Sequence, residues 1–203
     1  MNARHWMRTA MAGFAGFAVV SLFIAFVVAA REPDKGAGVA PIGGPFRLVD
    51  DSNTAVTERT LAGKPSVMYF GYTFCPDVCP TTLLELSHWI QELGPDAGRM
   101  NYVFVTIDPQ RDTPALMHDY LSSFDKHIRG FTGTADEIAA IAREYHVYYK
   151  RIPTDDGGYV MDHSTPIYLM DSNGKFVSVI AYQEDDTSVL PKLRTLVAMT
   201  PSS

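Results

Sequence analysis

The chain has 203 residues, of which 46% are hydrophobic and 20% are charged. This length fits one domain with an additional segment, and the composition is that of an ordinary globular protein. The formal net charge is −6, and the sequence contains no basic stripe that could contact phosphate groups, so we expect no nucleic-acid partner. The chain holds 2 cysteines, too few for the disulfide framework that stabilises small secreted proteins.

The first long feature is an apolar run without charges from residue 10 to residue 30. As a helix with a rise of ~1.5 Å per residue, it would span roughly 30 Å, the thickness of a bilayer's hydrocarbon core. A cleaved signal peptide is the alternative, with Val28–Ala30 as its cleavage site, but the apolar region of a signal peptide usually has about 7–15 residues. We therefore predict an uncleaved transmembrane anchor at residues 10–30.

The charges at the two ends of this run indicate its orientation. Arg4 and Arg8 precede it, whereas Arg31 and Lys35 follow it, so the numbers nearly balance. A very short tail with two arginines favours a cytoplasmic N-terminus. We predict a cytoplasmic tail at residues 1–9, a single pass through the cytoplasmic (inner) membrane, and a domain on the periplasmic or extracytoplasmic side.

Residues 31–45 are rich in glycine, proline and alanine, which is typical of a flexible tether. Residues 46–203 then alternate strand-like and helix-like patterns. In chain order, these patterns predict a hairpin at 46–57, a buried strand at 66–72, a helix at 80–93, a buried strand at 102–107, a helix that begins near Pro114, a short bridge, a helix capped by Thr134, a strand–turn–strand at 167–180, and a last helix from 186 or 187 to 197.

This order of elements predicts the fold class. Strand–helix–strand units imply a parallel core with right-handed crossovers, and the closing strand–turn–strand adds antiparallel strands. A mixed central sheet flanked by helices follows. We predict an α/β, thioredoxin-like fold at residues 46–203, with an additional N-terminal hairpin and an insert between its halves.

Both cysteines lie where the first buried strand of this core meets its helix. A thiol at a helix N-terminus has a lowered pKa, which favours the reactive thiolate. Cys75 and Cys79 are separated by three residues, whereas thioredoxin-type oxidoreductases have two. Residues four apart share one face of a helical turn, so both sulfurs can point at one location. Metal or redox chemistry is therefore favoured over two cysteines that merely fill the core.

A distant histidine is the candidate third ligand. His163 precedes a Thr165–Pro166 step and an apolar strand, which is where thioredoxin folds place a cis-proline beside their cysteines. We therefore predict a cis Thr165–Pro166 bond and a position of His163 close to both sulfurs. Two thiolates and an imidazole suit copper or zinc, and the residues alone leave both metals open. The remaining histidines of the domain are interpreted as structural or surface residues, namely His88, His118, His127 and His146.

Three motifs follow one another along the chain, and the first two together are highly specific. They are Gly-Tyr-Thr-Phe-Cys-Pro-Asp-Val-Cys-Pro at 71–80, Val-Thr-Ile-Asp-Pro-Gln-Arg-Asp-Thr-Pro at 105–114, and Asp-His-Ser at 162–164. In order and spacing they resemble the SCO/SenC family, copper-delivery proteins for the assembly of cytochrome c oxidase, and the likeness extends from Phe46 to Val197.

This resemblance implies a set of ligands, a cargo and an acceptor. The family's ligands correspond to Cys75, Cys79 and His163, which would bind one copper ion as Cu(I) or Cu(II). The acceptor would be the dinuclear copper A centre of a cytochrome c oxidase subunit. We therefore expect a membrane-anchored copper metallochaperone that acts as a monomer and is not an enzyme.

A thiol-disulfide oxidoreductase that reduces the cysteines of the same acceptor is the alternative function. The helix N-terminus and the fold favour it equally well. The three-residue spacer and His163 favour the carrier, because thiol–disulfide exchange needs no histidine. A peroxiredoxin-like peroxidase would need a lone peroxidatic cysteine in its own motif, which the sequence lacks.

Two further groups of polar residues have both a structural and a functional interpretation. In the segment 108–114, Asp112 or Thr113 would cap the next helix and Arg111 would pair with a carboxylate; the weaker alternative is a rim for partner docking. Asp77 and Asp162 flank the candidate ligands and would either orient them or lie solvated on the surface.

Overall fold

The computed structural model describes residues 41–199 of the chain. The predicted cytoplasmic tail at 1–9, the predicted membrane anchor at 10–30 and the predicted tether as far as residue 40 lie outside the described residues. Among residues 41–199, no helix combines the length and the apolar character that a membrane span requires.

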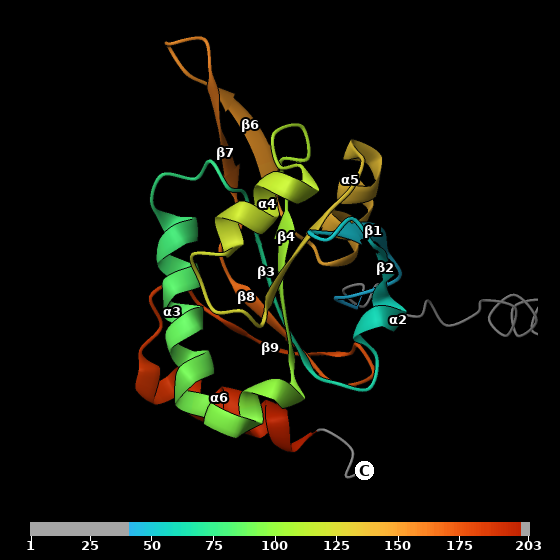
Figure 1. Cartoon of the computed structure of the whole chain (residues 1–203), viewed down its shortest axis with the longest axis vertical. Helices are drawn as coiled ribbons and strands as arrows, with labels where there is room; N and C mark the ends of the chain where they lie inside the picture. Colours follow the sequence, from blue (N-terminus) through green and yellow to red (C-terminus); the bar gives the residue numbers. More distant parts are fainter. Residues whose placement is uncertain (1–40, 200–203) are drawn as a thin grey trace, which may run out of the picture. The chain divides into compact units, whose positions relative to one another are not determined.

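A seven-stranded mixed sheet forms the centre of the domain, in the order β2-β1-β5-β4-β3-β8-β9 (Figure 1). Strands β3, β4 and β5 run parallel to one another, and every other pair of neighbours is antiparallel. This is the mixed sheet of the predicted fold, including the N-terminal hairpin. The strands are β1 (Arg47–Asp50), β2 (Ala55–Thr57), β3 (Ser66–Gly71), β4 (Asn101–Thr106), β5 (Ile128–Thr132), β8 (Ile167–Met170) and β9 (Phe176–Ile180).

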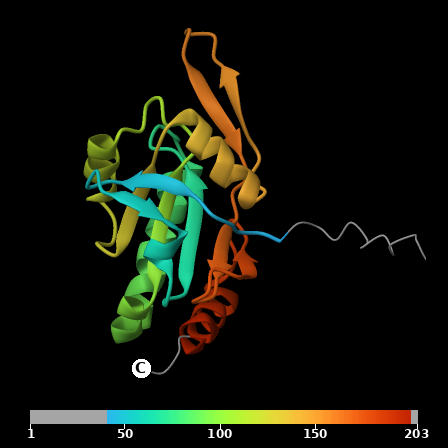
Figure 2. The same cartoon turned by 90° about the vertical axis from the view of Figure 1, so that its right-hand side faces the viewer.

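The two central parallel strands are buried along almost their whole length. Every residue of β3 and all but the first of β4 are buried. Continuous apolar runs are what strands covered on both faces require, since no side faces water. Helices α3 and α4 pack on one face of the sheet and α5 on the other (Figure 2). α3 and α4 share a face because each is the right-handed crossover between two successive parallel strands.

Helices α4 and α5 begin at the predicted signals. Thr113 caps α4, whose first residue is Pro114, and Thr134 forms the predicted capping box with Glu137 at the start of α5. The helix after the cysteines starts earlier than predicted, at Val78, so Cys79 lies in its first turn. The helices are α2 (Glu58–Leu61), α3 (Val78–Leu93), the 3₁₀ helix η1 (Gly94–Arg99), α4 (Pro114–Leu121), α5 (Ala135–Glu144) and α6 (Asp186–Ala198).

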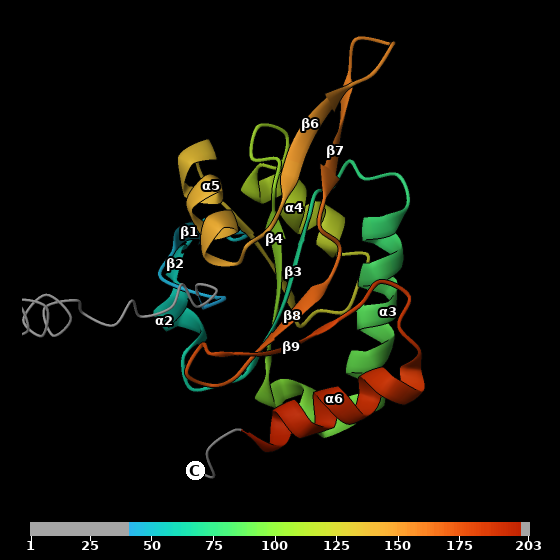
Figure 3. The same cartoon turned by 180° about the vertical axis from the view of Figure 1, so that it is seen from behind.

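A second sheet was not predicted. It is an antiparallel hairpin of β6 (Tyr149–Pro153) and β7 (Tyr159–His163). The hairpin projects beyond the end of the main sheet (Figure 3). Its residues are exposed or half-buried throughout, so it lacks the buried apolar face from which a strand is recognised in a sequence. His163 is the last residue of β7.

The predicted cis bond between Thr165 and Pro166 is wrong, because every peptide bond among residues 41–199 is trans. These residues link β7, which ends at His163, to β8, which begins at Ile167 and belongs to the other sheet. The trans form of an X–Pro bond is favoured by about 0.5–1 kcal/mol and suits this short link. The position of His163 therefore does not depend on a cis-proline.

The described end of the predicted tether contacts the domain. The side chain of Ile42 packs against the hydrophobic core. The backbone N–H of Gly43 donates to the carbonyl oxygen of Glu144 at the end of α5, at 2.8 Å. Contacts with the domain therefore begin before Phe46.

Candidate metal centre

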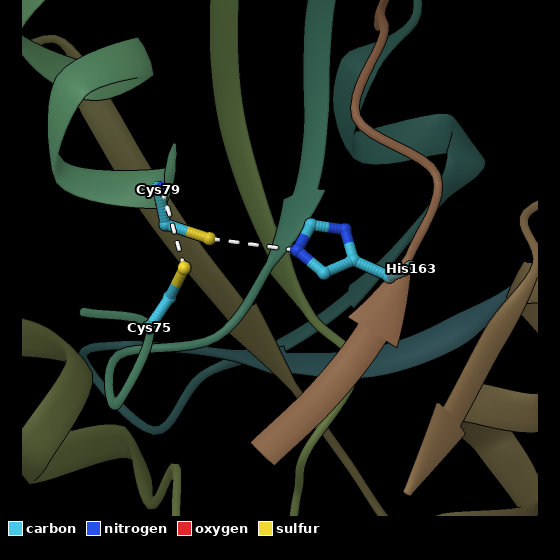
Figure 4. A group of neighbouring side chains, drawn as sticks. All are labelled: Cys75, Cys79 and His163. Carbon is cyan, nitrogen blue, oxygen red and sulfur yellow. Dashed lines mark hydrogen bonds between the residues drawn. The ribbon is translucent and has the colours of Figure 1, made fainter. Parts of the chain in front are cut away.

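Three side chains from separate parts of the chain meet beyond the carboxyl end of β3. The sulfurs of Cys75 and Cys79 and the imidazole of His163 point toward a common location (Figure 4). Their candidate ligand atoms all lie within 4.8 Å of one another. Nε2 of His163 lies 3.7 Å from Sγ of Cys79. The predicted proximity of the histidine and the cysteines is therefore present.

The cysteines are held by the junction of β3 and α3. Cys79 is fully buried in the first turn of the helix, whereas Cys75 lies in the loop before it and is half-buried. The backbone N–H of Cys79 donates to Sγ of Cys75 at 3.4 Å. A Cβ atom on Gly71 would lie 2.8 Å from Sγ of Cys79 and 2.8 Å from the ring of Phe104. Glycine at the end of β3 is therefore what lets the buried sulfur approach the strand.

The two thiols have opposite acidities. The pKa of Cys75 is lowered to about 3, because Cys79 and then His163 hydrogen-bond to its sulfur, as do the N–H groups of Asp77 and Cys79. The pKa of Cys79 is raised, first by its hydrogen bond to Cys75 and then by burial. The hydroxyl of Tyr69 donates to Sγ of Cys79 at 3.5 Å. At neutral pH the pair thus consists of a reachable thiolate and a buried thiol.

The imidazole of His163 is held in one orientation. Its Nδ1 lies 2.7 Å from the carbonyl oxygen of Ser164, and because a carbonyl only accepts, Nδ1 carries the proton. Nε2 therefore faces the sulfurs: with a proton it can donate to the Cys75 thiolate, and without one its lone pair can bind a metal ion. The ring stands edge-on to Tyr72, with centroids 5.9 Å apart and an interplanar angle of 84°.

The geometry fits one ion of a soft metal. Thiolate and imidazole bonds to a first-row metal measure about 2.0–2.3 Å, so two ligands of one ion lie roughly 3.3–4 Å apart. The 3.7 Å between Nε2 and Sγ of Cys79 is in this range. The upper limit of 4.8 Å between the ligand atoms exceeds this range by about 1 Å at most.

The flanking aspartates do not hold the histidine. Asp77 and Asp162 are both exposed. Asp162 accepts from the hydroxyl of Tyr148 at 3.4 Å, while the ring of His163 bonds to a backbone carbonyl instead. The solvated-surface interpretation of both aspartates fits these positions.

The other histidines of the domain lie apart from the three-residue cluster. His88, His118 and His146 are exposed. His127 is half-buried, and its Nδ1 lies 2.6 Å from a carboxylate oxygen of Asp125. All four are surface or structural residues, as predicted.

Several residues that support the site were not assigned such a role from the sequence. Tyr69 lies in β3 and Tyr72 directly follows it. The apolar run of this strand predicted only that both side chains are buried. Asp112 and Arg111 lie in the 108–114 motif, which was interpreted mainly as a helix start. The carboxylate of Asp112 instead binds Thr73, through the backbone N–H at 3.1 Å and the hydroxyl at 2.6 Å. The specificity of the 108–114 motif indicated a role beyond a helix start. The residue that Asp112 binds, Thr73, is distant in the sequence, so the motif alone did not identify it.

Comparison with known proteins gives consistent matches. The family model described as SCO1/SenC matches residues 34–198. The structure of Bradyrhizobium japonicum ScoI with copper bound is 48% identical, with a TM-score of 0.72, and the match covers 76% of this chain and 99% of that chain. Arabidopsis thaliana ScoI with copper bound is 37% identical, with a TM-score of 0.73 and coverage of 77% and 98%.

Curated sequences agree with these structures. Protein SCO1 homolog 1, mitochondrial, from Arabidopsis thaliana is 40% identical over 163 residues, which are 80% of this chain and 48% of that protein. The chain spans about half the length of the curated relatives it matches.

Proposed function

Because this chain belongs to the SCO1/SenC family, we propose that it binds one copper ion through Cys75, Cys79 and His163 and delivers it to the copper A centre of cytochrome c oxidase. The observation that carries this proposal is the convergence of two sulfurs and an imidazole nitrogen within 4.8 Å of one another. Solved relatives with this fold have copper bound, and Sco proteins are described as cytochrome c oxidase assembly proteins.

The ligand set suits a cargo that must be released again. Thiolates select Cu(I), and imidazole binds copper in either oxidation state. Three ligands leave a coordination position open, so a ligand of the acceptor can bind the ion before the carrier lets go. Cys79 must lose its proton when copper binds, because only the thiolate is a ligand, so copper binding releases a proton.

The partly exposed side of the centre suits direct transfer to another protein. Cys75 is half-buried, whereas Cys79 is buried beneath it. An approaching acceptor can therefore reach the ion from the side of Cys75. Of the two sulfurs, Cys75 would therefore release the ion before Cys79, because the acceptor can contact Cys75.

The location of the domain is part of the proposal. An anchor at residues 10–30 would hold the domain, as a monomer, at the outer face of the cytoplasmic membrane, where an oxidase subunit embedded in the same membrane is accessible. Fractionation tests this: the full chain stays in the membrane at alkaline pH, and a variant without residues 1–30 does not. Recovery of the full chain in the soluble fraction would contradict the anchor.

Thiol–disulfide exchange is a second candidate, favoured by the unequal thiols. The Cys75 thiolate would attack one sulfur of an acceptor disulfide, forming a mixed disulfide while the other acceptor sulfur leaves as a thiolate. Deprotonated Cys79 would then attack the sulfur of Cys75, forming the Cys75–Cys79 disulfide and releasing the second acceptor thiolate. The acceptor gains the two electrons that the pair loses, which prepares its cysteines for copper.

Copper titration of the wild type and of His163→Ala tests the carrier. We expect the variant to bind copper more weakly and with an altered thiolate-to-copper absorption spectrum, because a ligand is lost. His118→Ala, which removes an exposed histidine elsewhere, is the matched control and should behave as wild type. Equal affinity and an equal spectrum in His163→Ala would exclude the mechanism, and full disulfide-reductase activity in that variant would then favour the second candidate.

A further inference from the structure

The loop between β4 and α4 contacts both parts of the candidate metal centre. Arg111 in this loop lies between two aromatic rings, with its guanidinium carbon 4.7 Å from the ring centroid of Phe74 and 3.8 Å from that of Tyr159. Phe74 directly precedes the ligand Cys75, and Tyr159 begins β7, the strand that ends at His163. A single side chain thus joins the cysteine loop to the histidine strand.

Hydrogen bonds fix the strand end of this contact. Nη1 of Arg111 donates to the backbone carbonyl of Tyr159 at 3.1 Å. Nε of Arg111 donates to the carboxylate of Asp108, which also accepts from the hydroxyl of Tyr159 at 3.0 Å. Both the ring and the backbone of Tyr159 are therefore held by the same loop.

The remaining nitrogen of Arg111 strengthens this interpretation. Nη2 is buried and has no hydrogen-bond partner within residues 41–199. A buried N–H group without a partner is costly, and attraction of the cation to the faces of the rings compensates, more strongly when water is excluded. The stack of Phe74, Arg111 and Tyr159 is therefore an energetically significant contact.

The geometry of β7 connects the position of Tyr159 to that of the candidate ligand His163. Alternate residues of a strand share one face, so Tyr159, Met161 and His163 face the same way. These three are half-buried, and the residues between them are exposed. The backbone N–H of Met161 donates to the hydroxyl of Tyr72 at 3.2 Å. Three alternate residues of β7 thus contact the cysteine side: Tyr159 through Arg111, Met161 through its backbone N–H, and His163 through its ring.

The hairpin needs such attachment, because within the described part of the chain β6 and β7 pair only with each other and not with the seven-stranded sheet. We propose that Arg111 is a positioning residue, which holds β7 against the cysteine loop so that the imidazole of His163 reaches the sulfurs. This role rests on the proposed function. Without the guanidinium, the hairpin would sample positions in which copper is bound by the two sulfurs alone.

A double-mutant cycle tests this role in the full chain. Arg111→Met should weaken copper binding by about tenfold to a hundredfold, the usual effect of residues that orient metal ligands, and should shift the absorption spectrum toward that of His163→Ala. In the His163→Ala background the same substitution should change nothing further, because it acts through the missing ligand.

Arg151→Met is the matched control. The guanidinium carbon of Arg151 lies 3.5 Å from the centroid of Tyr159, so it stacks on the other face of the ring from Arg111. It bonds to Gln110 at 2.9 Å. Arg151 thus joins β6 to the β4–α4 loop, whereas it is Arg111 that reaches Phe74 in the cysteine loop. We therefore expect copper affinity in Arg151→Met to stay within about twofold of wild type.

Hydrogen exchange provides a readout without copper. The amide of Met161 should exchange faster in Arg111→Met than in the wild type or in Arg151→Met, since its bond to Tyr72 opens with the hairpin. If Arg111→Met does not fold, Arg111→Lys replaces it. Lysine keeps the charge but loses the planar stack and two donors, so both readouts should shift in the same direction by a smaller amount.

These measurements distinguish a failure of the proposed function from a failure of the positioning role. An unchanged affinity in His163→Ala would contradict the proposed function, and Met161 exchange would still decide whether Arg111 holds β7. Weaker binding in His163→Ala but not in Arg111→Met would overturn the positioning role and leave the function standing. Arg111→Met could also lower copper affinity equally in the wild type and in His163→Ala. That result would overturn the positioning role, because Arg111 would then act on the cysteines or on the fold.

Discussion

The cysteines of the candidate metal centre rest on the most buried part of the sheet, whereas the histidine lies at the end of a ribbon outside that sheet. Cys79 packs behind β3, whose residues are all buried, and its loop is tied to the buried carboxylate of Asp112 through Thr73. His163 ends a strand whose alternate residues are exposed. The cysteines are thus fixed by the core, whereas the histidine is fixed by a few contacts at the surface of the domain.

This difference suggests how copper could be both held and released. Rigid thiolates give a binding site without a large cost in conformational entropy. An imidazole on a lightly attached strand adds a third bond that a modest movement can break. A carrier benefits from this combination, because the ligand that leaves easily controls the exchange.

The largest expected effect is a difference in local stability between the two regions. Amides of β3 should exchange with solvent only through global unfolding, and those of β6 and β7 through local opening, a gap on the order of 5 kcal/mol. Hydrogen exchange of the metal-free chain measures it. Equal protection in both regions would remove the basis of the comparison.

Core truncation should produce the next largest effect. Leu83→Ala removes a fully buried side chain from α3 and should lower the free energy of unfolding by about 2–5 kcal/mol. Val160→Ala in the exposed face of β7 should cost less than about 0.5 kcal/mol. Leu84→Ala, an exposed leucine on the same helix, controls for the type of substitution. Denaturant unfolding measures these changes in the free energy of unfolding. A large decrease in Val160→Ala would show that the hairpin unfolds together with the core.

Removal of the carboxylate beneath the cysteine loop should have a smaller effect. Asp112 is fully buried and accepts from Thr73 and from the hydroxyl of Thr106. Asp112→Ala leaves these donors without a partner and should cost about 1–3 kcal/mol. Asp119→Ala, an exposed carboxylate on α4, should be neutral in the same unfolding assay. A neutral Asp112→Ala would show that the cysteine loop is not fixed in this way.

The smallest expected effect concerns the acidity of Cys75. An ordinary thiol with a pKa of about 8.5 reacts roughly tenfold more slowly with iodoacetamide for each pH unit below that value. Because the pKa of Cys75 is lowered to about 3, its thiolate fraction and alkylation rate should stay constant from pH 8 down to pH 5. The Cys75→Ser variant gives the background from buried Cys79. A rate that falls steadily over this range would contradict the assigned acidity.

The sequence predicted elements whose signals are local. The apolar run of β3, the capping box of Thr134 and the turn between β8 and β9 each depend on neighbouring residues, and all three were found. Strand β5 was missed because Gly130 interrupts its pattern. A Cβ at Gly130 would lie 2.9 Å from side-chain atoms of Leu121 and Met117 on α4, so tertiary packing imposes a residue that local preference disfavours.

The sequence by itself determined the types of candidate ligand. Two cysteines four apart at a strand–helix junction and a histidine before an apolar strand make up a soft ligand set, which leaves copper, zinc and thiol chemistry open. Only the tertiary structure decided how the histidine reaches the sulfurs, through an exposed hairpin held by Arg111 and Tyr72 rather than through a cis-proline. The residue types themselves specify which ligand atoms are present. The distance between them depends on side-chain contacts across the fold, and no local pattern in the chain encodes that distance.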